Sequence, residues 1–186
     1  MKKTLLAIIL LSSMLLNANT NKEIKLQAKQ AFMKMGKTLQ SNMKKNMKKG
    51  GPIKAANFCS QEAVNIEHKV NANYPKWIRV KRISLKYRNP NNAPSDDEAK
   101  VLKEIQDKVD NHQKVPKMIV KKISQHTYKV YKPLFIGKKV CLKCHGMKDI
   151  RDQKAYKIIK ETYPQDKAIN YKKGDFRGAF VAEITK

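Results

Sequence analysis

Cys141-Leu142-Lys143-Cys144-His145 is the stretch from which the rest of this sequence is best understood. Two thiols at this spacing can each add to one of the two vinyl groups along an edge of a porphyrin, and the histidine that follows is then placed beneath the iron. The CxxCH pattern therefore predicts one covalently attached haem c. Cys141 and Cys144 are the expected thioether residues, and His145 is the expected axial ligand.

Two other chemistries use the same residue types. A CxxC pair is also a redox dithiol, although such a pair does not require a histidine directly after it. A structural zinc site would use Cys141, Cys144 and His145, with Cys59 as the fourth ligand. Haem attachment is the prediction, and the zinc site is the alternative that metal analysis distinguishes from it.

The N-terminal segment has the three-part layout of a secretory signal. The basic pair Lys2-Lys3 precedes an apolar run over residues 5–16, and cleavage is expected after Ala18. The run is too short to span a bilayer, so we expect a periplasmic chain of residues 19–186 with no transmembrane span. An uncleaved anchor is the alternative. Export agrees with the motif, because c-type attachment normally takes place outside the cytoplasm.

The length of the exported part predicts a single haem-binding domain, and its composition predicts a basic surface. The sequence contains 41 Lys and Arg residues against 15 Asp and Glu, which gives a formal net charge of +26. Such a surface favours an acidic redox or signalling protein, or anionic lipid headgroups. A solvated lysine-rich surface without any partner is equally open. Nucleic acid is not an expected partner, because of the export signal and the lack of an arginine-rich reading element.

Apolar residues that recur every three or four positions predict helices in four places. Gly50-Gly51 separates the first two, which are long, and Pro52 suits the first turn of the second. Ser95 and Glu98 form a capping box at the start of the third. The helices are expected over residues 21–49, 52–72, 95–110 and 151–162.

Alternating apolar residues predict strands between and after these helices. In the first strand the alternation changes parity, which predicts a β-bulge near Lys81-Arg82. A second strand leads into the CxxCH motif, and a third ends the sequence. The strands are expected over residues 77–87, 128–136 and 174–184. Helices that precede and separate strands in this way predict an α+β fold with an antiparallel sheet.

Cys59 is the third cysteine, and it lies on the apolar stripe of the second helix. Ala56 and Ala63 are one turn to either side, so the helix surface has room for a flat macrocycle. His68 is on the opposite face and is expected to be exposed. On this pattern Cys59 is either a small buried residue or a second ligand of the iron. The competing ligands are His126, Met35 and Met43.

Four separated segments carry a joint pattern: Phe58-Cys59, Arg82 to Pro94, Cys141 to Gly146 and Gly174 to Ala179. Together they resemble the small c-type haem domain with a PAS-like sheet that occurs in bacteria and cyanobacteria, alone or on sensor kinases and chemoreceptors. The resemblance covers nearly all of the exported chain. It implies about five antiparallel strands flanked by helices, with His145 and Cys59 as the axial ligands of the iron.

This ligand pair favours a sensor of redox state or of a diatomic gas. A thiolate stabilises ferric iron, and dissociation of Cys59 would open a coordination position to CO or NO. A ligand that exchanges in this way is a two-state element, which a sensor needs. The alternative is an electron-transfer cytochrome whose basic surface docks an acidic partner. An enzyme is not expected, because His112 and His126 have no acid or base partners at recognisable spacing.

Haem propionates are anionic and are expected to contact cationic side chains. Arg82 and Arg88, in and after the first expected strand, are the candidate propionate contacts. Solvated surface charges or salt bridges within the loop are the alternative for both residues.

The purified protein is expected to give a c-type pyridine haemochrome spectrum with one haem per chain, because both thiols of the motif form thioethers. The measurement is an optical spectrum together with metal analysis. No haemochrome and one zinc ion per chain would instead identify Cys59, Cys141, Cys144 and His145 as a zinc site.

Overall fold

The computed structural model describes the backbone of residues 2–186 and the side chains of residues 20–186. The predicted secretory segment, residues 1–18, lies outside the residues whose side chains are described. Within the described part of the chain, no helix is long and apolar enough to cross a membrane.

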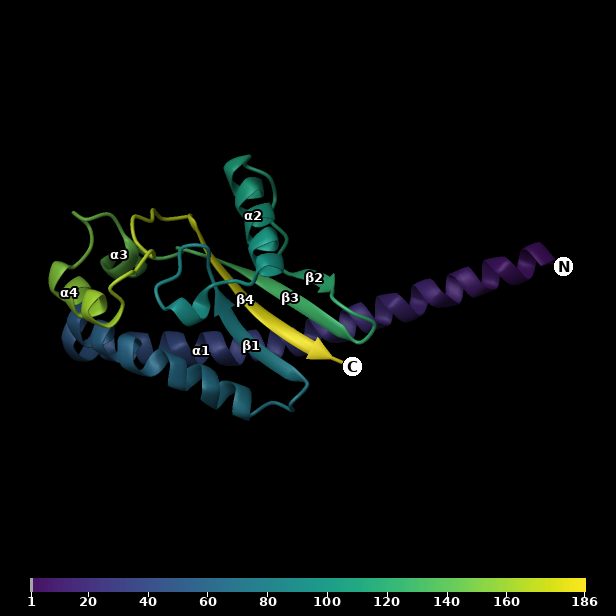
Figure 1. The fold of residues 1–186 in the computed structure, drawn as a ribbon, viewed down its shortest axis with the longest axis horizontal. Helices are drawn as coiled ribbons and strands as arrows, with labels where there is room; N and C mark the ends of the chain where they lie inside the picture. The colour runs from purple at the N-terminus through teal and green to yellow at the C-terminus, as the bar shows by residue number, and fades with distance from the viewer. Residues whose placement is uncertain (1) are drawn as a thin grey trace.

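The first element, α1 (Lys2–Ala72), is two helices joined at a kink. Gly50 and Gly51 have non-helical backbone angles, and Gly51 has φ 64° and ψ −157°. Only glycine adopts this conformation readily, because it lacks a Cβ atom. The chain reverses there, so residues 52–72 run back beside the first part of α1 (Figure 1). The two predicted long helices are confirmed.

The remaining elements complete an α+β domain, as predicted. They are β1 (Ile78–Ile83), the 3-10 helix η1 (Pro90–Asn92), α2 (Asp96–Asp110), β2 (Ile119–Lys122), β3 (Thr127–Phe135), α3 (Lys139–His145), α4 (Gln153–Thr162) and β4 (Phe176–Thr185). The strands form one antiparallel sheet in the order β1-β4-β3-β2. The described residues thus contain four strands, where about five were expected. β2 was not predicted, because its four residues are too few to show an alternating pattern.

The two faces of the sheet support separate cores, because successive side chains of a strand point to opposite faces. Ala182 of β4 belongs to the cluster that packs against Phe32 of α1. The preceding residue, Val181, belongs to the cluster that packs against Leu102 of α2. Figure 1 shows α1 and α2 on the two sides of the sheet. β4 is therefore buried on both faces.

The predicted bulge near Lys81-Arg82 is wrong. Over residues 78–83, all of which the structure describes, β1 pairs with β4 without a break in register. The parity changes because Ile78 and Val80 pack in the core against α1, whereas Ile83 of the same regular strand packs in the core against α2 on the opposite face. Close packing marks this end: Gly178 of β4 has φ 138°, and a Cβ atom there would lie 2.2 Å from the Ile83 carbonyl oxygen.

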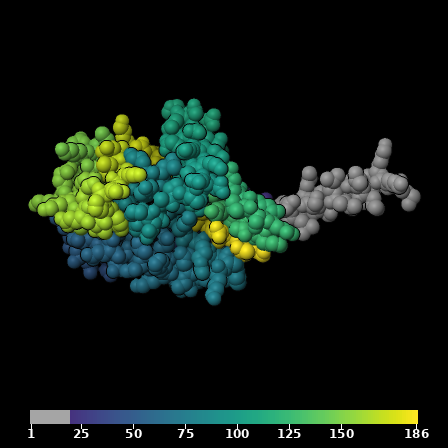
Figure 2. Space-filling view, in the orientation of Figure 1, coloured from purple at the N-terminus to yellow at the C-terminus, as the bar shows by residue number. Residues whose placement is uncertain are grey.

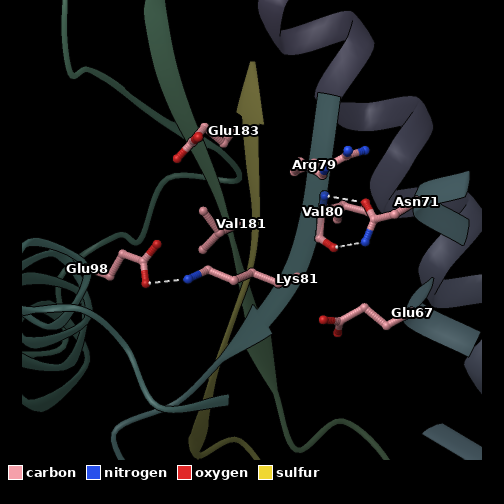
Figure 3. A pocket seen from close by; sticks show the side chains of 8 residues that line it. All are labelled: Glu67, Asn71, Arg79, Val80, Lys81, Glu98, Val181 and Glu183. Atoms are coloured by element: carbon pink, nitrogen blue, oxygen red, sulfur yellow. Dashed lines mark hydrogen bonds and ion pairs between the residues drawn. The ribbon is translucent and has the colours of Figure 1, made fainter. Parts of the chain in front are cut away.

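A buried carboxylate joins α2 to the sheet. Glu98 is fully buried and accepts hydrogen bonds from the Ser95 amide (3.1 Å), Lys81 Nζ (2.9 Å) and Lys129 Nζ (3.0 Å). Burial pushes the pKa of Glu98 upward, but these donors outweigh it and hold the pKa below its ordinary value. The predicted capping box of Ser95 and Glu98 is confirmed. Glu98 also anchors α2 to β1 through Lys81 (Figure 3) and to β3 through Lys129.

The outer edge of β1 is closed by Asn71 of α1. Its side-chain amide donates to the Val80 carbonyl oxygen (2.8 Å), and its side-chain oxygen accepts from the Val80 amide (2.7 Å) (Figure 3). An unpaired strand edge is a template for association with other strands. Asn71 occupies this edge as a neighbouring strand would.

Glu98→Gln is expected to lower the free energy of unfolding by about 3 kcal/mol at neutral pH, because Lys81 and Lys129 lose their anionic partner. The folded-state pKa of Glu98 lies below its ordinary value of 4.5. Its charge therefore stabilises the fold above that pH, and the contribution is lost as the pH falls through the folded-state pKa. Urea unfolding of both proteins at neutral and acidic pH should show the difference shrinking below pH 4.5.

Glu104→Gln is the matched control. Glu104 pairs with Lys121 in an exposed contact of 3.1 Å, so this change should cost less than about 0.5 kcal/mol. A difference between wild type and Glu98→Gln that stays constant through the acid range would contradict the role given to Glu98.

Candidate functional site

The CxxCH motif forms most of α3, at the end of the sheet where β3 stops and β4 begins (Figure 1). Just before α3, the Ile136 amide donates to the Asp175 carbonyl oxygen (2.9 Å), which ties the two strands together. Cys141, Cys144 and His145 are each half-buried. Because residues three apart lie on one side of a helix, the two thiols are presented together.

The His145 ring has a defined tautomer. Its Nδ1 atom lies 2.7 Å from the carbonyl oxygen of Ala168, which can only accept a hydrogen bond. Nδ1 therefore carries the proton, and Nε2 carries the lone pair that binds a metal. Burial lowers the pKa of His145 well below its ordinary value, with further lowering by the positive charges of Arg88 and Arg177. The imidazole is neutral at physiological pH and suited to coordination.

Arg88 holds the loop that orients His145. Its Nε donates to Asp166 Oδ2 (3.1 Å), and its Nη2 donates to the carbonyl oxygen of Cys144 (2.7 Å). Asp166 Oδ1 in turn accepts from the amide of Ala168 (2.8 Å). The Arg88–Asp166 pair thus connects the end of α3 to the carbonyl that fixes the ring. A propionate contact by Arg88 stays a prediction, and any such contact must share a guanidinium that these bonds already use.

The helix that carries Cys59 packs against the motif. Ala56, one turn before Cys59, lies in a buried cluster with Ala155 and Ile159 of α4, and Cys144 packs against this cluster. The Tyr163 hydroxyl, at the end of α4, donates to the carbonyl oxygen of Ser60 (3.2 Å). The structure therefore brings the third cysteine to the same end of the domain as the other two.

The thiols of Cys59 and Cys144 are both protonated in the protein without a bound metal. Burial raises the pKa of Cys59, while the positive charges of Arg82 and Arg88 partly offset it. Burial also raises the pKa of Cys144 to about 11, while the positive charge of Arg88 partly offsets the increase. A metal that binds Cys59 must displace its proton, and the two arginines favour the resulting anion.

A cavity of about 180 Å³ lies beside His145. Arg82 and Arg177 line it together with His145, and its other lining residues are Ile83, Ser84, Asn92, Leu134 and Gly178. The Arg82 Nε atom is buried and has no hydrogen-bond partner among the described residues, and Glu67 Oε2 is 4.0 Å away. An orphaned guanidinium N–H next to an imidazole fits an anionic ligand. The residues present therefore fit a haem: two thiols, an imidazole with a free Nε2 and a cation for a propionate.

Arg177 is a site residue that the sequence reasoning missed. Its Nη1 donates to Ser84 Oγ (2.8 Å) and to the Lys86 carbonyl oxygen (3.2 Å), and burial lowers the pKa of its guanidinium. The signal was available, because Arg177 falls on the polar face of the last predicted strand and inside the segment from Gly174 to Ala179.

Two of the competing ligands lie away from this site, and Met43 of α1 stays an untested alternative. His126 is exposed in the turn between β2 and β3, and the nine residues of β3 separate it from α3. Met35 is fully buried in the core between α1 and the sheet. Within the described residues, no three His, Cys, Asp or Glu side chains come close enough to hold a metal ion. The zinc alternative therefore lacks its ligand cluster.

Comparison with known proteins identifies relatives of this arrangement. The sequence matches the family described as Tll0287-like over residues 17–185. The fold is similar to the crystal structure of the cyanobacterial haem protein Tll0287, with 26% sequence identity and a TM-score of 0.53. That match covers 69% of this chain and 71% of the other. Among curated proteins no match was found.

Arg88→Gln is expected to lower the free energy of unfolding by about 2–4 kcal/mol, because the buried Asp166 carboxylate loses its partner and α3 loses its tie to Ala168. The measurement is urea unfolding followed by circular dichroism. Lys167→Gln is the control. Lys167 Nζ makes only exposed contacts with Tyr87, to its hydroxyl (3.1 Å) and its ring (4.6 Å), so its loss should cost less than about 0.5 kcal/mol. Equal stability of the two variants would show that Arg88 does not hold the site.

Proposed function

The chain belongs to the Tll0287-like family, and from that premise we propose that it is a periplasmic monohaem c-type cytochrome that senses redox state or a diatomic gas. The likeness to a haem protein supports haem binding, and the CxxCH motif supports covalent attachment. The observation that carries the proposal is the His145 ring. Its Nδ1–H is held by the Ala168 carbonyl oxygen (2.7 Å), which leaves Nε2 as a ligand beside two thiols.

The proposed roles follow from where the side chains lie. Bound haem supplies a redox-active iron whose potential depends on its axial ligands. Cys141 and Cys144 hold it through thioethers, while His145 and Cys59 are the axial ligands. Arg82, whose Nε has no hydrogen-bond partner among the described residues, contacts a propionate.

The two thioether cysteines and the two proposed axial ligands come from two different helices, and this supports a sensor. Cys141, Cys144 and His145 all come from α3, whereas Cys59 comes from the second half of α1. Release of Cys59 would therefore break the one coordinate link between α1 and α3 and leave the covalent attachment intact. Such a link converts a change at the iron into a change between two helices. We also propose that the domain has a PAS-like fold.

Location and catalysis are inferred from the residues alone. The N-terminal signal pattern supports export to the periplasm, where the chain would act without a transmembrane span. No catalytic role is proposed, because His68, His112 and His126 are all exposed and the sequence places no recognisable acid–base motif around His112 or His126.

An electron-transfer cytochrome is the second candidate, and one observation favours it. Met147 and Ile150, directly after the motif, are 38% and 42% exposed. Exposed apolar side chains beside Lys148 and Lys143 form a surface that an acidic redox protein can dock on. A simple carrier needs this surface but does not need an exchangeable Cys59.

Cys59→Ser is expected to keep covalent haem and to abolish the signs of thiolate ligation. The native ferric protein should be low-spin, with a red-shifted Soret band and the EPR signature of a thiolate. The variant should lose both features and should have a higher reduction potential, because the charge donation that favours ferric iron is removed. Optical and EPR spectra with a redox titration make the measurement.

Ser60→Ala is the matched control on the same turn of α1. It keeps the Ser60 carbonyl that binds Tyr163 and should leave spectrum and potential unchanged. If Cys59→Ser also leaves them unchanged, Cys59 is a core residue and the electron carrier becomes the better assignment.

A further inference from the structure

Four segments meet at the end of the sheet opposite α3, which we call the distal end: residues 20–26, 74–77, 122–127 and 185–186. The amide of Thr185 donates to the Trp77 carbonyl oxygen (3.0 Å), and the amide of Lys186 donates to the His126 carbonyl oxygen (2.7 Å). Lys186 Nζ also pairs with Glu23 of α1. Figure 2 shows the C-terminal residues and the β2–β3 turn side by side on the surface there.

The distal end exposes large apolar side chains. Trp77 is 54% exposed, Ile123 48% and Leu26 55%. Trp77 lies on the turn from α1 to β1 and Ile123 on the turn from β2 to β3, and neither side chain belongs to the core on either face of the sheet. Trp77 is also the single tryptophan of the chain.

The distal end is also strongly cationic. Its four segments contain Lys22, Lys25, Lys76, Lys122 and Lys186 against one acidic side chain, Glu23. Glu23 is already paired with Lys186, so it neutralises none of the other lysines. Exposed apolar tips surrounded by lysines are the composition that binds the interface of an anionic bilayer.

We propose that the distal end docks on an anionic phospholipid surface, with Trp77 and Ile123 at the level of the headgroups and the lysines above them. An acidic protein would be attracted by the lysines alone, whereas an indole and aliphatic tips on protruding turns fit a lipid interface better. The predicted secretory segment ends at Ala18, next to this end in sequence. The nine residues of β3 would hold α3 roughly 30 Å from the lipid, free for other contacts.

The test uses the exported chain, carrying whatever haem it holds, and vesicles of phosphatidylglycerol and phosphatidylcholine in equal parts. The protein is expected to sediment with these vesicles and not with pure phosphatidylcholine, and to be released by high salt. Trp77 emission should shift to shorter wavelength on binding, and this readout is specific because no other tryptophan is present.

Matched variants distinguish docking through the distal end from a general electrostatic attraction between the basic chain and anionic lipid. Trp77→Ser with Ile123→Ser should weaken vesicle binding at least tenfold, and Lys22→Gln with Lys76→Gln and Lys122→Gln should do the same. Lys148→Gln with Lys154→Gln and Lys157→Gln removes the same charge near α3 and should leave binding unchanged. Absence of vesicle binding, binding without a shift in Trp77 emission, or equal loss in the two lysine triples would each overturn the proposal.

Discussion

β4 is the strand on which the rest of the structure depends, because it pairs with β1 on one side and β3 on the other. Its side chains alternate between the core against α1 and the core against α2. Both cores contain residues of β4, so neither core is complete without this strand. The close approach of Gly178 to the Ile83 carbonyl then sets the position of Arg177 beside Ser84 and the cavity at His145.

The site is assembled at one end of this sheet from elements far apart in the chain. In the candidate site the two thiols and the imidazole come from α3, the proposed ligand Cys59 lies on α1, and Arg82 and Arg177 lie on strands. The Arg88–Asp166 pair links the end of α3 to the loop at Ala168 that orients His145. The charges around the candidate site would favour an anionic ligand there. A buried thiol resists ionisation, and guanidinium groups placed around it make an anionic ligand less costly to bury.

The two ends of the sheet differ in chemistry. The end at α3 combines cysteine, histidine and buried arginine, and the distal end combines exposed tryptophan, aliphatic tips and lysine. The core between them is apolar on both faces, so each end can make its own contacts without disturbing the other. The chain has a formal charge of +26, and its charged side chains have different neighbours at the two ends of the sheet.

Features that depend on neighbouring residues could be predicted from the sequence: the CxxCH motif, the break between two long helices at Gly50-Gly51, the capping box at Ser95 and the alternating pattern of the last strand. Helix and turn preferences act over a few residues. Two other features come from tertiary contacts: β1 runs to Ile83 without a bulge, and Ala168 fixes the tautomer of His145. Those features depend on the register of β4 and on loops that meet across more than twenty residues, and no local pattern encodes which segments come to lie side by side.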